Sequence, residues 1–406
     1  MQADHYISNS LRSGSAVTTE RRSATSRGLG GLLLALALLP SAGAAGLSEL
    51  WHVSNWSLSP ALAARAGYDS NLFARADGED DAFLEVQPML RLMSRPSLTA
   101  LSLEASARFV NFAEWHDQNS IDPALRVKYR YPDVEGELTR AEMDLLLSKA
   151  SVANSDIGRR VRETLLSWRW EATVAATGKT TLQARLAAWR RSYREPDLNT
   201  NDSIAGGFDV AFVSNEKLQL GAGYDLSASR SRPSLAGAMR IRRVENAITV
   251  RGRGEFTPYV SGYFYLGLAH ARYSEAQDRS ENDLIAGARL EWKIRERLRL
   301  ATKTDRRVYF SPEGDAVLET SAGFELRQEI SGGYTARLGA DVARLVYRRT
   351  SDYRRDTTVP ITAALDYMFN RSLSATLEST WSEQRSDWAF RTYQRGTFIG
   401  RAEYRF

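Results

Sequence analysis

Apolar and polar residues alternate with a period of two from about residue 57 to Phe406, and polar turn residues interrupt the pattern about every 20 residues. In residues 284–294 every second position from Leu284 to Ile294 is apolar, while Arg289, Glu291 and Lys293 lie between them. Successive side chains of a strand point to opposite faces, so this pattern predicts a strand with one apolar and one polar face. Helical spacing is not sustained anywhere, so we expect an all-β protein.

The alternation occurs in 18 segments, and its repetition in nearly every segment distinguishes this chain from a soluble protein with a single such sheet. A transmembrane barrel repeats this pattern in every strand, because one face of each strand meets lipid and the other meets the interior. We therefore predict one closed antiparallel transmembrane β-barrel over residues 57–406, with 18 strands, 16 being the alternative. The predicted strand starts lie near residues 57, 81, 98, 122, 136, 161, 180, 203, 217, 245, 259, 282, 297, 315, 333, 357, 372 and 391.

Short and long connections alternate along the chain. An even number of strands returns the C-terminus to the periplasmic side, where such barrels have tight turns. The predicted turns hold residues 95–97, 132–133, 177–179, 214–216, 257–258, 295–297, 331–333 and 370–371. We expect the more polar connections, including residues 199–202 and 354–356, to be extracellular loops. Residues 230–243 are the leading candidate for a loop that folds into the pore.

The final segment predicts how the barrel is inserted. Phe398, Tyr404 and Phe406 lie on one face of this segment, which ends on the aromatic residue Phe406. A terminal aromatic residue preceded by alternating apolar residues matches the outer-membrane assembly signal. We expect the insertion machinery to recognise this segment by strand pairing.

The N-terminal region has the features of a secretory signal peptide. Basic residues up to Arg27 precede the apolar stretch 29–39, Pro40 follows, and Ala42-Gly43-Ala44 provides a cleavage site. We expect a signal peptide over residues 1–44 and a short periplasmic segment over 45–56. The general secretory route fits better than the twin-arginine route. These features predict a protein of the outer membrane of a Gram-negative cell, surrounded by outer-membrane lipid.

Composition narrows the chemistry. The chain has no cysteine, which excludes disulfides, thiolate catalysis and cysteine-based zinc sites. Its formal net charge of +5 is too small to indicate nucleic-acid binding. A hydrolase would need a serine beside a histidine, and His270 with Ser274 is a weak candidate that an interfacial polar residue explains better. The acidic residues 77–81 could hold a cation, but a solvated turn is the better reading. We expect no enzyme activity, no cofactor and no metal.

The polar faces of the strands define a pathway. Basic and acidic residues are both abundant there, so cross-strand ion pairs explain most of them. The alternative is a charged route that selects a polar solute. The inward aromatic residues Trp189, Tyr263 and Tyr265 could stack on sugar rings or simply fill space. The basic candidates for the lumen are Arg126, Lys128, Arg130, Arg169, Arg185, Arg191, Arg251, Arg253, Arg289, Lys293 and Arg299, of which the first three form the strongest local stripe.

The first segment ends in Gly67-Tyr68-Asp69-Ser70-Asn71. This tract, followed by about 18 strands and a terminal Phe, resembles the β-barrel porins grouped as porin 2. The resemblance implies a passive conduit for an exported polysaccharide (exopolysaccharide or capsule) that works with a periplasmic export complex. Two alternatives remain: a general or solute-specific uptake porin, and a non-conducting barrel that acts as a hydrolase or scaffold.

Overall fold

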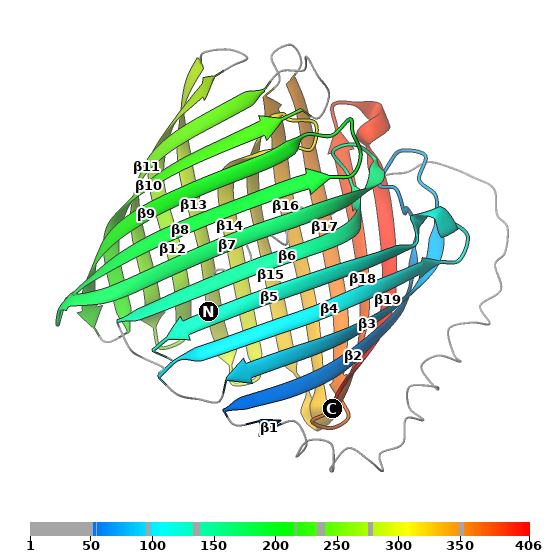
Figure 1. The fold of residues 1–406 in the computed structure, drawn as a ribbon, viewed down its shortest axis with the longest axis horizontal. Helices are drawn as coiled ribbons and strands as arrows, with labels where there is room; N and C mark the ends of the chain where they lie inside the picture. The colour runs from blue at the N-terminus through cyan, green and yellow to red at the C-terminus, as the bar shows by residue number, and fades with distance from the viewer. Residues whose placement is uncertain are drawn as a thin grey trace.

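The computed structural model describes residues 52–53, 55–94, 98–132, 139–215, 217–233, 240–274, 279–348 and 353–406. Nearly all of them lie in strands of one antiparallel sheet (Figure 1). The predicted signal peptide, residues 1–44, lies outside the described residues. The strands are β1 (His52–Val53), β2 (Trp56–Asp69), β3 (Asp81–Ser94), β4 (Ala100–Phe112), β5 (Ser120–Tyr131), β6 (Arg140–Asn154), β7 (Arg159–Thr177), β8 (Thr180–Tyr193), β9 (Thr200–Asn215), β10 (Leu218–Arg232), β11 (Ile241–Thr257), β12 (Val260–Ser274), β13 (Arg279–Arg295), β14 (Leu298–Phe310), β15 (Ala316–Glu329), β16 (Tyr334–Arg348), β17 (Tyr353–Met368), β18 (Leu373–Ser386) and β19 (Tyr393–Arg405).

The sheet closes into a barrel. Each strand from β2 to β19 pairs with the next one along the chain, and β19 pairs back onto β2 with Thr397 opposite Asp69 and Arg405 opposite Ala61. The short strand β1 pairs only with the start of β2. The predicted closed antiparallel barrel of 18 strands is confirmed, and each observed strand starts within four residues of the predicted position. Closure pairs every strand edge, which a lipid environment requires.

The two faces of the barrel follow the predicted alternation. Large apolar side chains such as Ile204, Ile248 and Leu268 are more than 60% exposed on the outside. Residues at the alternate positions of the strands point inward, and they include the buried acids Glu85, Asp209 and Glu319. No helix in the described part of the chain is long and apolar enough to cross a membrane.

The two ends of the barrel differ in their connections. At one end β7 and β8 are joined by only Gly178 and Lys179, β11 and β12 by Pro258 and Tyr259, and β13 and β14 by Glu296 and Arg297. At the opposite end, called here the long-loop end, residues 70–80 join β2 to β3 and residues 194–199 join β8 to β9. Bacterial barrels carry their longer loops outside the cell, so the long-loop end is the extracellular one.

Two expected loops are mostly strand. Thr200–Asp202 belongs to β9 and Arg354–Asp356 belongs to β17. The expectation that residues 230–243 fold into the pore is wrong for the described part of that segment. β10 and β11 pair as far as Ser231 opposite Ile241, and the exposed residues Arg230 and Arg242 have the parity of the outer face. Neighbouring strands supply ladder partners here, so polar residues remain extended. Residues 234–239 lie outside the described part.

Candidate functional site

The inner wall of the barrel carries rows of ion pairs between neighbouring strands. Arg65 on β2 contacts Glu85 on β3 at 3.0 Å, and Arg108 on β4 contacts Asp122 on β5 at 2.6 Å. Arg337 on β16 contacts Asp366 on β17 at 2.7 Å. Inward positions on adjacent strands lie directly opposite each other, as for Arg65 and Glu85, or diagonal to each other, as for Arg337 and Asp366, so opposite charges placed there pair across the ladder.

The most extensive of these networks spans β8 to β11. Asp209 and Asp225 lie between Arg185 and Arg251, and each arginine contacts both carboxylates. The Arg185–Asp225 and Arg251–Asp209 distances are 3.0 and 3.1 Å. Two positive and two negative groups therefore compensate each other on one wall. Together they offer donors and acceptors to the lumen with little net charge.

A glycine makes room for this network. A Cβ atom at Gly223 would lie 1.9 Å from Asp209 Oδ1 and 3.1 Å from Arg251 Nε. Real Cβ atoms do not approach other atoms that closely, so any side chain at this position would displace the carboxylate. The network thus depends on a small residue as well as on its charged members.

The predicted basic stripe on β5 is largely neutralised. Arg126 pairs with Asp144, and Arg130 contacts Glu142 at 3.4 Å. Lys128 lies opposite Asp144 in the register of β5 and β6 and also has an interaction partner. The three residues are on one strand as expected, but the neighbouring strand supplies two acids, Asp144 and Glu142, that pair with Arg126 and Arg130.

The structure distributes the other predicted lumen residues over several parts of the wall. Arg191 lies 3.5 Å from Glu163, and Arg253 lies 3.9 Å from Glu171. Tyr265 donates a hydrogen bond to Asp305 at 2.7 Å, a contact from β12 to β14. The remaining candidates lie opposite the following residues in the strand register: Arg169 opposite Asp144, Trp189 opposite Ser203, Tyr263 opposite Arg289, and Lys293 opposite Arg299. Arg299 also forms an ion pair with Glu291.

The long-loop end of the lumen is bridged by contacts that cross it. The hydroxyl of Tyr347 on β16 donates a hydrogen bond to Asp156, which lies between β6 and β7. Arg354 on β17 donates to the main-chain oxygen of Asp156 at 3.2 Å. β7 and β16 are nine strands apart in a ring of 18, so these groups come from opposite walls. We call Asp156, Tyr347 and Arg354 the mouth latch.

The mouth latch is tightly packed. Tyr347 is 1% exposed and Arg354 2%, and the Arg354 guanidinium lies 4.0 Å from the centre of the Tyr347 ring. Arg354 is also held by Asp356. Burial raises the pKa of Asp156, and the Tyr347 hydrogen bond and the Arg354 charge oppose that rise.

Local sequence explains the shape of the loop that carries Asp156. The main-chain N–H of Asp156 donates a hydrogen bond to the Asn154 side chain at 3.0 Å, and Gly158 adopts a left-handed φ of 63°. Asn and Gly are the residues that favour such turns. The tight turn projects Asp156 into the lumen.

Other segments at the long-loop end close around the mouth latch. The Asn199 N–H donates to the oxygen of Pro312 at 2.8 Å, and Asn201 donates to the oxygen of Ser311 at 3.0 Å. Arg391, which precedes β19, lies 3.8 Å from Glu313. Residues 311–315 therefore tie the β8–β9 side of the mouth to the β18–β19 side.

A family comparison identifies the kind of barrel. The family described as "Putative beta-barrel porin 2" matches residues 51–207 and 246–400, which is well over half of the chain. The chain belongs to the beta-barrel porin 2 family. The resemblance seen in the sequence is thereby confirmed, and the protein is a porin-like β-barrel of the outer membrane.

The porin also resembles solved structures, at low identity. The copper transporter OprC has a TM-score of 0.47 and 10% identity, covering 87% of this chain and 82% of its own. OpdK, an outer-membrane protein from Pseudomonas aeruginosa, has a TM-score of 0.46 and 12% identity, covering 86% and 98%. The FrpB iron transporter from Neisseria meningitidis has a TM-score of 0.45 and 8% identity, covering 89% and 83%. A search of curated proteins found no match.

The residues considered for catalysis or metal binding have structural partners in this porin. His270 contacts the Asn282 side chain at 2.8 Å. Asp81 accepts hydrogen bonds from the main chain of Glu114 and Trp115. Within the described residues, no group of His, Asp and Glu is arranged to hold a metal ion.

The mouth latch of this porin is not apparent from the sequence. Asn154 to Gly158 could have been read as a tight turn, but no sequence signal links it to Tyr347, 191 residues away from Asp156. Phe398 and Phe406 of the predicted assembly signal are exposed on the outer face, and Tyr404 stacks edge-on against Phe406 at 4.7 Å.

Proposed function

We propose that this porin is a gated conduit that carries a hydroxyl-rich solute across the outer membrane, and that its cargo is a secreted polysaccharide. The observation that carries the proposal is the lumen wall of compensated ion pairs, which the mouth latch bridges at the long-loop end. Direction and energy would come from a periplasmic export complex, because the barrel itself contains no energy source.

The paired charges favour a neutral or weakly charged polar cargo. A ring of one sign would select ions by charge. Here Arg185, Asp209, Asp225 and Arg251 offer N–H donors and carboxylate acceptors next to each other. A sugar hydroxyl both donates and accepts, so it can exchange partners along such a wall without a strong field holding it in place.

The closed mouth favours regulated passage over constant diffusion. A general uptake porin functions with its lumen open on both sides. The contacts of Tyr347 and Arg354 with Asp156 span the lumen and must separate before a polymer can pass. A growing chain pushed from the periplasm provides a reason for them to open.

Deletion of the gene tests the cargo. Secreted and cell-associated polysaccharide should fall in the deletion strain and return when the gene is supplied on a plasmid. Unchanged polysaccharide in the deletion strain would overturn the export proposal. Growth on small sugars as limiting carbon source, measured in the same strains, would then test the uptake alternative.

Conductance in planar bilayers tests the conduit itself. We expect the purified porin to be mostly closed, with rare openings whose selectivity between K⁺ and Cl⁻ is weak. Strong selectivity for one ion would contradict the argument from compensated charges. A protein that never conducts, including after disruption of the mouth latch, would support a scaffold instead.

A further inference from the structure

Arginines form a row on the outer face of the barrel at the long-loop end. Arg190 on β8, Asp202 on β9, Arg230 on β10 and Arg242 on β11 lie directly opposite one another in the register of these four adjacent strands. The side chains of the three arginines are exposed. The row therefore has three positive groups and one negative group.

The single acid in the row cannot compensate the arginines around it. Asp202 contacts Arg230 at 2.9 Å, Arg232 at 2.6 Å and Arg190 at 3.6 Å. Arg230 also lies directly opposite Arg242, and like charges at such positions destabilise a sheet. An anion that bridges these guanidinium groups would remove this cost.

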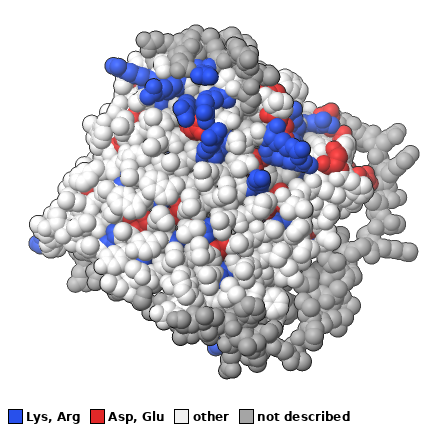
Figure 2. All heavy atoms as spheres, viewed as in Figure 1, with Lys and Arg blue, Asp and Glu red and all other residues white. Residues whose placement is uncertain are grey.

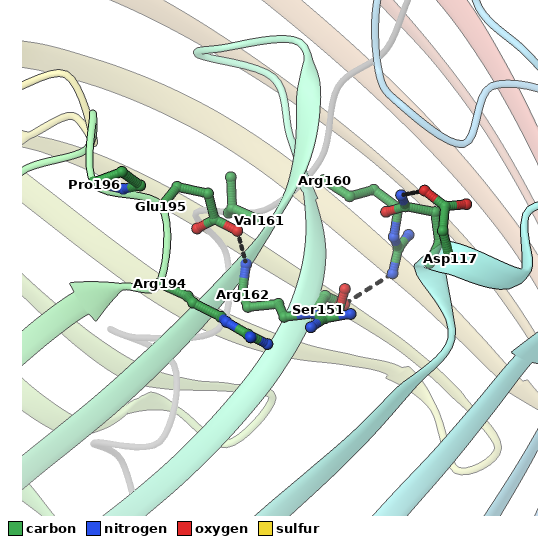
Figure 3. Close-up of a pocket in the computed structure, with 9 residues that line it drawn as sticks. Asp117, Ser151, Arg160, Val161, Arg162, Arg194, Glu195 and Pro196 are labelled. Atoms are coloured by element: carbon green, nitrogen blue, oxygen red, sulfur yellow. Dashed lines mark hydrogen bonds between the residues drawn. The ribbon is translucent and has the colours of Figure 1, made fainter.

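A second pair of arginines lies beyond the row, toward the long-loop end. Arg190 is opposite Leu166 on β7, and Arg194 and Arg162 are each four residues further from that pair. The Arg194 N–H donates to the main-chain oxygen of Arg162 at 3.0 Å, which places the two residues side by side. In Figure 3 both side chains extend toward the same side of the strands. They line a hollow of about 360 Å³ together with Arg160, Asp117 and Glu195. Glu195, which also lines this hollow, accepts the main-chain N–H of Arg162 at 3.1 Å.

The position of these arginines coincides with the boundary of the apolar belt. Ile204, one residue pair below Asp202 on β9, is 62% exposed, and Ile248 and Leu268 on β11 and β12 are 68% and 69% exposed. Figure 2 shows Lys and Arg gathered in the upper part of the visible face, above a broad band that is mostly uncharged. The belt contacts acyl chains, so the arginines lie at the depth of lipid headgroups.

We propose that Arg162, Arg190, Arg194, Arg230, Arg232 and Arg242, called here the arginine patch, bind the phosphate groups of a phosphorylated glycolipid of the outer leaflet. Arginine presents a planar fork of donors that matches phosphate oxygens, and it is weakly hydrated. The acyl chains of the same lipid molecule would cover the exposed Ile204 and Ile248. A lipid, rather than free phosphate, fits because the patch adjoins the apolar belt on the outer face. This binding does not depend on what passes through the lumen.

The chain offers a matched control at the same end of the barrel. Arg344 on β16, Arg355 on β17 and Arg385 on β18 are also exposed on the outer face. Thr357 separates Arg344 from Arg385 in the register, so no two arginines of this set are directly opposite each other. Removing these three charges changes the net charge as much as removing three from the patch.

The test measures binding of purified full-length porin in detergent to lipid A by native mass spectrometry. The wild type should bind bisphosphorylated lipid A at least tenfold more tightly than its dephosphorylated form. The triple variant R190Q/R230Q/R242Q should bind the bisphosphorylated lipid at least tenfold more weakly, and R344Q/R355Q/R385Q should stay within about twofold of the wild type. Thermal unfolding followed by circular dichroism verifies that the variants are folded.

Three results would overturn the proposal. Equal weakening in both triple variants would mean that the rim attracts lipid only by overall charge. Equal binding of the two lipid forms by the wild type, which requires no variant, would exclude phosphate recognition. Displacement of the lipid by millimolar inorganic phosphate would point to a free-phosphate site.

Discussion

Replacing Tyr347 by Phe should make the porin open more often. The substitution removes only the hydroxyl, which donates to Asp156 across the lumen and accepts a long hydrogen bond from Arg354 on the same wall at 3.4 Å. The ring remains and can still pack against the Arg354 guanidinium, which lies 4.0 Å from its centre. Arg354 can also still donate to the Asp156 main-chain oxygen. The variant therefore weakens the mouth latch without emptying the space that the side chain fills.

The size of the effect follows from the worth of one buried hydrogen bond. Such a bond contributes about 1 kcal/mol when both partners are neutral and about 1.5–3 kcal/mol when one is charged. A contact between opposite walls exists only while the mouth is closed, so its loss acts fully on the closed state. About 1–3 kcal/mol shifts the equilibrium between closed and open porin roughly 5- to 150-fold toward open. Tyr347 is buried, so solvent screening does not reduce this value much.

Single-channel recording in planar bilayers measures the open probability directly. Tyr265→Phe is the matched control, because it also removes a hydrogen bond from a tyrosine to an aspartate, at 2.7 Å, but between strands of the same wall. We expect Tyr347→Phe to raise the open probability at least fivefold and Tyr265→Phe to leave it nearly unchanged. Thermal unfolding should differ little between the two variants, because neither removes a strand pairing.

An open probability of Tyr347→Phe equal to that of the wild type would refute the reasoning. It would mean that the contacts of residues 311–315, or of Arg391 with Glu313, hold the mouth closed without the latch. An equal increase in Tyr265→Phe would show that any loosening of the wall opens the lumen, which also contradicts a local latch.

Further predictions concern acidity, packing and assembly. Burial in the closed mouth raises the pKa of Asp156 above its ordinary value of 3.8. Protonation of Asp156 therefore stabilises the closed state at acidic pH, and this stabilisation is lost as the pH rises through the raised pKa. The open probability should therefore increase from acidic to neutral pH in the wild type, and Asp156→Asn should remove that dependence. Gly223→Ala should lower the free energy of unfolding by about 1–3 kcal/mol through overpacking. Gly400→Ala is the control and should lower it less, because the added Cβ would meet its nearest neighbour at 3.7 Å. Equal melting temperatures of the two variants would contradict the proposed role of Gly223. Phe406→Ala should reduce the amount of folded barrel in outer-membrane fractions, and an unchanged amount would argue against the assembly signal.

The compensated lumen and the arginine patch use the same residue type in opposite ways. Inside, Arg185 and Arg251 share two carboxylates, so their charges are compensated and hold the neighbouring side chains of the wall in place. Outside, Arg190, Arg230 and Arg242 have one carboxylate among them in their row. In these two groups the uncompensated positive charge faces the lipid rather than the pore. This distribution is consistent with the weak ion selectivity that we expect of the lumen.

The sequence by itself determined the strands, their number and their faces. Alternation with a period of two is a local property, because each side chain points opposite to its neighbour whatever lies beyond the strand. Turn residues are local too: Gly178 and Gly332 marked connections that the structure places between β7 and β8 and between β15 and β16. The sequence was less accurate where polar residues continue a strand, as at Thr200–Asp202, since only a paired neighbour shows that they are extended.

Only the tertiary structure decided which residues meet. The register of β8 to β11 places Asp209 and Asp225 between Arg185 and Arg251, and the same register aligns Arg190, Arg230 and Arg242 on the outside. Closure of the ring brings Asp156 across to Tyr347 and Arg354, which are 191 and 198 residues further along the chain. These contacts depend on strand stagger and on the circumference of the barrel. Both are set by all 18 strands together, so no local segment of the sequence encodes them.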